Sequence, residues 1–394
     1  MEKNYRKTLT ACYLGFITQA VTANFAPLLF ITFNSSYKVP LGKIALIPAV
    51  FFMTQLVVDI ICAKVVDKIG YRKCVVASSF CSAVGLALLA FLPDLFYDPF
   101  IGIILSVVIY AVGSGLIEVL GSPIVEACPF EHKEAVMSLL HSFYCWGSVA
   151  VIVLSTLFFK FCGIANWKIL SCLWAVIPVF NIYNFAVCPI EHPTGGEKGM
   201  GIRELFRLPL FWISVVLMVC AGASELSMAQ WVSAFAESAL KLSKSVGDLA
   251  GPCLFAVMMG TCRAIFGKFG HKMNLPRFMI VSGILCLASY LIASLSTIPL
   301  LGLAGCILCG FSVGIMWPGT ISICSPKIPK GGTALFAMLA MAGDLGGSAG
   351  PAAVGTVSQF FNNNLQAGLL AGCVFPVVLI VMVLLMGKQT NKKV

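Results

Sequence analysis

The chain has 394 residues, of which 59% are hydrophobic and only 11% are charged. Soluble domains carry about 25% charged residues, so this composition excludes a soluble enzyme, a secreted disulfide scaffold and a disordered chain. One membrane crossing takes about 20 apolar residues, and twelve crossings need about 240, close to the number available. We therefore predict an all-α, polytopic membrane protein.

Apolar segments separated by charged or Pro- and Gly-rich stretches predict twelve transmembrane helices. They begin near residues 9, 43, 73, 99, 134, 167, 208, 246, 277, 299, 332 and 365. Lys and Arg are enriched in cytoplasmic loops. If both termini are cytoplasmic, 20 of these side chains lie inside and 6 outside, which accounts for all 26. We expect a multi-pass protein of the plasma or bacterial inner membrane with both termini in the cytoplasm.

The longest polar stretch lies at the middle of the chain. Its Pro and Gly content is typical of a flexible linker, which predicts a six-helix bundle over residues 1–188, a cytoplasmic linker over 189–205 and a second six-helix bundle over 206–394. Basic loops follow both the second and the eighth spans. Repeated halves of this kind place a substrate site near the bilayer midplane, between halves that rock against each other.

The loop after the second span carries several charges around one glycine. Its candidate gating residues are Asp67, Lys68, Gly70, Arg72 and Lys73. Gly70 permits a turn with positive φ, while Asp67 can accept N–H bonds from a neighbouring helix start or pair with Arg72. Such a cluster could latch two helix ends in one conformation and release them in another. An ordinary positive-inside loop is the alternative.

This loop resembles the signature between the second and third helices of the major facilitator superfamily, in which an Asp, a Gly and basic residues follow a small residue at the same spacing. The span count and the central linker extend the resemblance over the whole chain. It implies the major facilitator fold and transport by alternating access. The loop after the eighth span has Phe269-Gly270 and lacks the Asp, so a latch there would be degraded.

Three segments are similar to sugar transporters of that superfamily. Residues 113–123 resemble the fourth helix of the fucose:proton symporter branch, residues 137–147 its fifth helix, and residues 222–231 the seventh helix of sugar permeases. The resemblance implies a sugar as the substrate.

The chain differs from that branch at the positions where the family binds the sugar and titrates the proton. Ser122 replaces the family's Asn before Pro123, and Tyr144 lies near the sugar-binding Asn. The titrating Asp of the first helix has no acidic counterpart, and Asn24 or Thr22 occupies its neighbourhood.

Four acids and one mid-span histidine fall within the predicted spans. An ionisable group at the bilayer centre costs at least about 2.5–3.5 kcal/mol, so each is a functional candidate. Proton coupling is predicted for Glu118, Glu225, Asp344 and His141. The alternative for Glu118 is a protonated structural group bonded to a neighbouring helix, and for His141 it is a core histidine bonded to a backbone carbonyl. Glu225 could instead be solvated near the extracellular mouth.

Helical spacing favours two substrate-binding faces. Ser114, Glu118 and Ser122 are spaced i, i+4 and i+8 and share one face, and His141 shares another with Tyr144. Asp344 is surrounded by glycines, which indicates either a loosened helix beside a cavity or a tight helix crossing.

Two further charged residues and two tryptophans complete the predicted set. Asp59 and Arg263 lie toward the cytoplasmic side and are predicted to belong to gating networks rather than to the substrate site. Trp231 and Trp317 fall within spans, where their rings could stack on a sugar or simply pack.

These features lead to one functional prediction: a secondary transporter for proton-coupled uptake of a small neutral polar solute, above all a sugar. A proton-driven exporter of amphipathic molecules is the alternative, because the same fold supports it. No metal-ligand set, nucleophile–base pair or phosphate loop appears, so we expect no enzyme, cofactor or metal. The expected partners are the sugar-like solute, protons and the lipid bilayer. We expect a monomer and no nucleic-acid binding.

Overall fold

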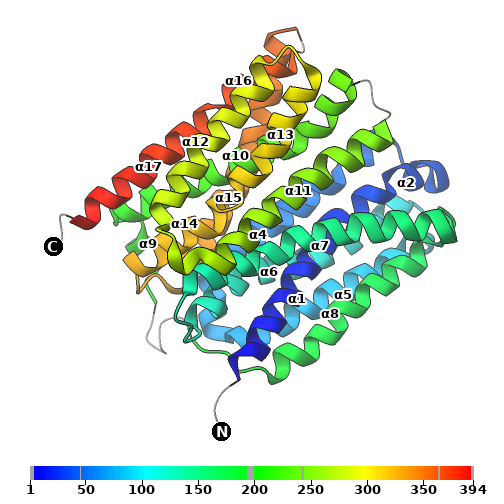
Figure 1. The fold of residues 1–394 in the computed structure, drawn as a ribbon. Coiled ribbons are helices and arrows are strands. Elements are labelled where there is room, and N and C mark those ends of the chain that lie inside the picture. The colour runs from blue at the N-terminus through cyan, green and yellow to red at the C-terminus, as the bar shows by residue number, and fades with distance from the viewer. Residues whose placement is uncertain (1–3, 45, 193–198, 241–243, 363, 392–394) are drawn as a thin grey trace. The chain divides into compact units, whose positions relative to one another are not determined.

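The computed structural model describes residues 4–44, 46–192, 199–240, 244–362 and 364–391. Within these ranges every regular element is a helix, which confirms the all-α prediction (Figure 1). Residues 193–198 of the predicted linker lie outside the described residues.

Eleven segments of the described chain are long and apolar enough to cross a membrane. They comprise α1 (Tyr5–Asn24) with η1 (Ala26–Leu29) and α2 (Phe30–Tyr37), α4 (Leu46–Ile69), α5 (Tyr71–Leu95), α6 (Pro99–Ala127), α7 (Lys133–Cys162), η2 (Ile164–Asn166) with α8 (Trp167–Val187), α10 (Pro209–Leu240), α11 (Lys244–Phe269) with η3 (Gly270–Lys272), α12 (Leu275–Leu295), α13 (Pro299–Val313) with α14 (Met316–Cys324) and η4 (Ser325–Lys327), and α16 (Leu365–Gly372) with α17 (Val374–Asn391). The short helices α3 (Leu41–Ile44) and α9 (Ile202–Leu205) lie between spans.

Helix α15 (Gly332–Phe360) is the remaining long helix of the described chain. It has 29 residues, enough to span a bilayer, but six glycines and Asp344 make it less apolar than the others. Counting α15, the described chain contains the twelve predicted spans.

The chain forms two compact units. The first comprises Met1–Pro129, Trp146–Lys198 and Gly332–Ala337, and the second comprises Phe130–Cys145, Gly199–Gly331 and Met338–Val394. Helix α7 therefore has its first part in the second unit and its remainder in the first.

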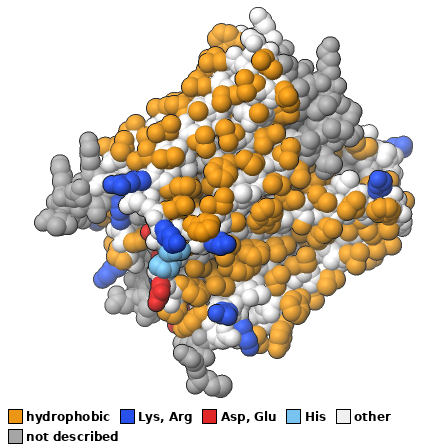
Figure 2. Space-filling model, in the orientation of Figure 1, with side chains coloured by type: hydrophobic (Ala, Val, Ile, Leu, Met, Phe, Trp, Pro, Cys, Tyr) orange, Lys and Arg blue, Asp and Glu red, His pale blue; other side chains and the backbone are white. Residues whose placement is uncertain are grey.

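Apolar side chains lie on the outside of the molecule and many polar ones lie inside. Ile31, Leu95, Val281 and other large hydrophobic residues are exposed, whereas Gln55, Arg263 and numerous serines are buried. Hydrophobic side chains cover most of the face in Figure 2, and charged ones lie mostly toward the helix ends. Lipid rather than water suits such a surface.

Helices α10 and α15 cross backbone to backbone in the second unit. A Cβ added to Gly222 would overlap the carbonyl oxygen of Gly343, and one added to Gly346 would overlap that of Val219. Glycines allow this close approach, which lets van der Waals contacts hold the two helices together.

We predict that Gly222→Ala destabilises the protein by about 1–3 kcal/mol, the usual cost of overpacking, because a methyl group there must push α15 away. Thermal unfolding of the purified protein in detergent measures the effect. Gly387→Ala is the matched control, since a Cβ on Gly387 of α17 meets nothing within 4 Å. An unchanged melting temperature for Gly222→Ala would contradict the crossing.

Candidate functional site

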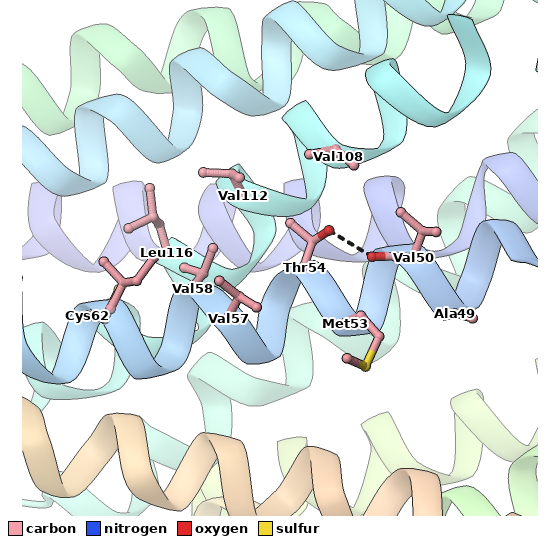
Figure 3. A pocket seen from close by; sticks show the side chains of 11 residues that line it. Ala49, Val50, Met53, Thr54, Val57, Val58, Cys62, Val108, Val112 and Leu116 are labelled. Carbon is pink, nitrogen blue, oxygen red and sulfur yellow. Dashed lines mark hydrogen bonds between the residues drawn. The ribbon is translucent and has the colours of Figure 1, made fainter. Parts of the chain in front are cut away.

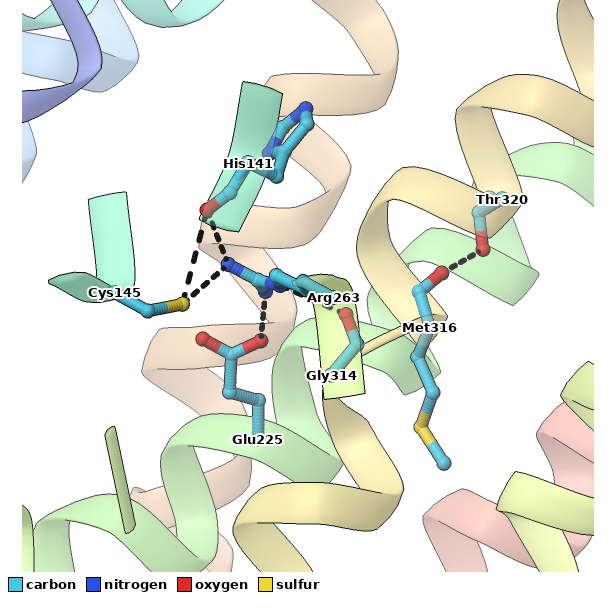
Figure 4. Close-up of polar contacts among 7 residues, drawn as sticks. All are labelled: His141, Cys145, Glu225, Arg263, Gly314, Met316 and Thr320. Carbon is cyan, nitrogen blue, oxygen red and sulfur yellow. Dashed lines mark hydrogen bonds and ion pairs between the residues drawn. The ribbon is translucent and has the colours of Figure 1, made fainter. Parts of the chain in front are cut away.

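A buried arginine organises the polar interior of the second unit (Figure 4). Arg263 of α11 is only 3% exposed. Its Nε donates to the carbonyl of Gly314 at 2.8 Å, and its Nη1 donates to the carbonyl of His141 and to the sulfur of Cys145, both at 3.1 Å. Its Nη2 lies 3.3 Å from Oε2 of Glu225 on α10. One side chain thus links four segments of the second unit.

The backbone supplies acceptors for Arg263 where a helix is interrupted. Helix α13 ends at Val313 and α14 begins at Met316, so the Gly314 carbonyl lies in the interruption. Carbonyls at a helix C-terminus lack intrahelical partners and carry partial negative charge. The Glu225 carboxylate compensates the remaining charge, which a buried cation requires.

The first part of α7 packs along α11, and we call this contact the α7–α11 seam. Its deep end is formed by Arg263 and the groups that the Arg263 side chain binds, which we call the Arg263 cluster. There Ser138 Oγ also donates to the Arg263 carbonyl at 2.8 Å. In its middle, a Cβ on Gly267 would lie 3.0 Å from the Cβ of Leu139. At its outer end, where the loop before α7 meets η3 after α11, the rings of His132 and His271 have centroids 5.3 Å apart. All of these residues belong to the second unit.

A second polar cluster lies in the first unit, between α4 and α6. Gln55 Nε2 donates to Glu118 Oε2 at 2.8 Å and to Ser114 Oγ at 3.2 Å. The shared face predicted for Ser114 and Glu118 is therefore present. A Cβ on Gly115 would lie 3.3 Å from the Cα of Gln55, so this glycine lets α4 approach. Asp59, one turn beyond Gln55, is fully buried.

The other predicted site residues divide between the two units. Asn24 and Ser122 lie with Glu118 in the first unit, whereas His141, Tyr144 and Asp344 lie with Glu225 in the second. Asn24 Nδ2 donates to the carbonyl of Ala20 at 2.8 Å and to Ser148 Oγ at 3.2 Å. Asp344 Oδ2 is buried and has no hydrogen-bond partner in the described part of the chain.

Both predicted tryptophans make contacts between helices of the second unit. Trp231 Nε1 donates to the Pro351 carbonyl at 3.2 Å, and the ring of Trp317 packs directly against Gly343. Both side chains are half-buried.

In the charged loop between α4 and α5, Asp67 and Arg72 bind different helices. Asp67 Oδ1 accepts a hydrogen bond of 2.5 Å from Thr333 Oγ at the start of α15, and the Tyr71 hydroxyl also bonds Thr333. Arg72 instead donates to the carbonyls of Phe185, Ala186 and Cys188 at the end of α8, at 2.9, 2.6 and 2.9 Å. The donor to Asp67 at this helix start is thus a side-chain hydroxyl, whereas the prediction named backbone N–H groups or Arg72.

The other predicted gating residues of this loop form its turn or lie at its surface. Gly70 has φ of +96°, as predicted. Lys68 and Lys73 are exposed. The loop lines a cavity of about 330 Å³ together with Glu191 and His192, and His192 Nε2 lies 3.9 Å from Asp67 Oδ1.

An apolar pocket of about 640 Å³ lies on the first unit (Figure 3). Its lining consists of Ala49, Val50, Met53, Thr54, Val57, Val58, Ile61, Cys62, Val108, Val112 and Leu116. It contains none of the predicted site residues and offers a sugar almost no hydrogen bonds.

Three contact residues of these clusters were missed by the sequence prediction. Gln55, Thr333 and Cys145 had no assigned role, because the side chains that they bind lie at least 59 positions away in the sequence. Thr333 follows Gly331-Gly332, and this pair of glycines indicates a helix start, where a Thr hydroxyl can bond a neighbouring carboxylate.

A family model described as the Major Facilitator Superfamily matches residues 11–351. The chain belongs to the major facilitator superfamily. It is therefore a multi-pass membrane transporter. No curated protein sequence matches it significantly.

Solved structures share the fold of this transporter. The Escherichia coli fucose:proton symporter FucP aligns with a TM-score of 0.82 at 15% identity, covering 98% of this chain and 99% of that one. The proton:xylose symporter XylE, bound to 6-bromo-6-deoxy-D-glucose, gives 0.80 at 11%, covering 97% and 95%. The human organic anion transporter MFSD10 gives 0.76 at 15%, covering 97% and 100%. At these identities the likeness shows the fold alone.

We predict that Arg263→Leu lowers stability by about 3–5 kcal/mol, since it leaves the Glu225 carboxylate, which is only 13% exposed, without its cation. The double variant Arg263→Leu/Glu225→Leu should recover part of this loss, because neither charge then remains. Melting temperatures of the wild type, both single variants and the double variant test the coupling. A double variant less stable than Arg263→Leu would show that the pair does not stabilise the fold.

We also predict that Thr333→Val costs about 1.5–3 kcal/mol, the usual contribution of a hydrogen bond to a charged group, because it removes the hydroxyl that donates to Asp67 and also bonds Tyr71. Thr356→Val serves as the control, since Thr356 is exposed and bonds only the Ala352 carbonyl of its own helix. If both variants melt at the same temperature, the Asp67–Thr333 contact contributes no stability.

Proposed function

We propose that this transporter takes up a small neutral polar solute, a sugar above all, together with protons, by alternating access in the plasma membrane with both termini cytoplasmic. One observation carries the proposal: each unit holds a carboxyl group inside its membrane spans within a hydrogen-bonded cluster. Glu118 lies with Gln55 and Ser114, and Glu225 lies with Arg263.

Glu118 and its neighbours form the part of the site that suits a sugar. Hydroxyl groups of a sugar both donate and accept hydrogen bonds, and the first unit offers the Glu118 carboxyl, the Gln55 amide and the Ser114 hydroxyl on adjoining faces of α4 and α6. Ser122 and Asn24 add further polar groups. The fold shared with FucP and XylE, which are named as sugar:proton symporters, supports this choice.

The partner of each carboxyl suggests how protons take part. An amide both donates and accepts, so Gln55 can bond Glu118 whether or not that carboxyl carries a proton. A guanidinium only donates, so protonation of Glu225 would remove the charge attraction to Arg263 and leave at most a hydrogen bond to a neutral oxygen. We therefore assign Glu225 the coupling role, in which proton uptake loosens the Arg263 cluster.

Asp344 and His141 are the two remaining coupling candidates. The Oδ2 atom of Asp344 is buried without a described hydrogen-bond partner, as fits a carboxyl that holds a proton. His141 bonds Arg263 through its backbone carbonyl, and we place it with Tyr144 at the solute site of the second unit.

The charged loop acts as a gate in this proposal. Asp67 and Thr333 join the end of α4 to the start of α15, while Arg72 anchors α5 to the end of α8. The Asp67–Thr333 bond is the contact that would break and reform during the transport cycle. We place Asp59 and Arg263 in the same gating machinery.

Sugar transport is tested in right-side-out vesicles that contain the protein. We expect a sugar from a broad panel to alkalinise the external medium, and Glu118→Gln to weaken binding by about 10–100-fold, because hydrogen bonds to charged groups contribute about 1.5–3 kcal/mol. A thermal-shift screen of the same sugars measures binding independently.

Glu131→Gln is the control, since Glu131 is exposed in the loop before α7. If no sugar alkalinises the medium and none shifts the melting temperature, sugar symport is wrong. If expression instead confers resistance to amphipathic compounds, the protein is a proton-driven exporter.

A further inference from the structure

Two histidines meet at the outer end of the α7–α11 seam. His132 lies in the loop just before α7, and His271 lies in η3, directly after α11. Both side chains are exposed, and their rings have centroids 5.3 Å apart with planes inclined by 33°. Together they make up half of the four histidines in the chain, and the transport proposal uses neither.

The separation of the two rings matches that of two histidines bound to one metal ion. Zn²⁺ binds imidazole nitrogen at about 2.0–2.1 Å with tetrahedral angles, which holds two ring centres about 5 Å apart. Imidazole suits Zn²⁺, Cu²⁺ and Ni²⁺, whereas Mg²⁺ and Ca²⁺ prefer oxygen ligands. We propose that His132 and His271 form a binding site for a divalent transition metal ion such as Zn²⁺.

The surroundings define what kind of site this is. No group of three or more His, Cys, Asp or Glu side chains within metal-binding reach occurs in the described residues, so water completes the metal's coordination. Glu131 and Glu134 precede and follow the first histidine closely, while Lys272 adjoins the second. The site is therefore open and exchanges its ion, unlike a closed structural zinc centre.

Metal binding at this position would have a mechanical effect. Arg263 and Gly267 already hold the deep and middle parts of the seam, and a bridging ion would fasten its outer end. The ion would thus join α7 to α11 across 139 positions of sequence and resist their separation. This inference is independent of which solute the protein carries.

The test uses the full-length protein without a polyhistidine tag, purified in detergent and freed of metal with a chelator. Calorimetric titration with ZnCl₂ should show one site per chain, and Zn²⁺ should raise the melting temperature. Residues that merely support metal ligands already contribute about 10–100-fold to affinity, so His132→Ala and His271→Ala should each weaken Zn²⁺ binding by at least about 10-fold.

His192→Ala is the matched control, because His192 lies beside Asp67 in the first unit and should leave Zn²⁺ binding unchanged. Both test residues are exposed, so their variants should fold, and their melting temperatures without metal verify this. The proposal is overturned if the wild type binds no Zn²⁺, if either single variant binds it as tightly as the wild type, or if His192→Ala weakens binding equally.

Discussion

The structure of the second unit depends on a permanent positive charge placed among membrane-spanning helices. A guanidinium cannot lose its proton in a protein, so the only ways to accommodate Arg263 are to surround it with acceptors or to leave it in water. It is buried, and a carboxylate, two carbonyls and a thiol surround it. The positions of Glu225, of the interruption between α13 and α14 and of the first part of α7 are all tied to this requirement.

The carboxyl groups within the membrane spans of the two units have partners of different charge. Glu225 is balanced by a fixed cation, whereas Glu118 is bonded by the neutral amide of Gln55. The first arrangement responds strongly to a change in protonation, and the second tolerates it. This difference is the reason for our proposal that Glu225 couples proton uptake to movement and that Glu118 binds the solute.

Sequence alone predicted the helices well, because the length of an apolar segment and the charged residues at its ends are local properties of the chain. It also predicted the positive φ of Gly70 and the shared face of Ser114 and Glu118, since both follow from backbone geometry. It could not pair residues distant in the chain. Arg263 and Glu225 were assigned to different roles although they touch, and Thr333 was overlooked although it lies 266 positions from the Asp67 it binds. Such pairs depend on how helices pack, which no local pattern records.

The glycine-rich composition of α15 has a consequence for how the protein is made. A segment enters the bilayer according to its own apolarity, and an Asp at its centre disfavours insertion by about 2.5–3.5 kcal/mol. Helix α15 combines Asp344 with six glycines and is therefore poorly suited to partition into lipid alone. Its close fit against α10, which is synthesised more than 90 residues earlier, offers it a protein surface in place of lipid. Biogenesis of the second unit then depends on order of synthesis: α10 must already be in the membrane when α15 leaves the ribosome.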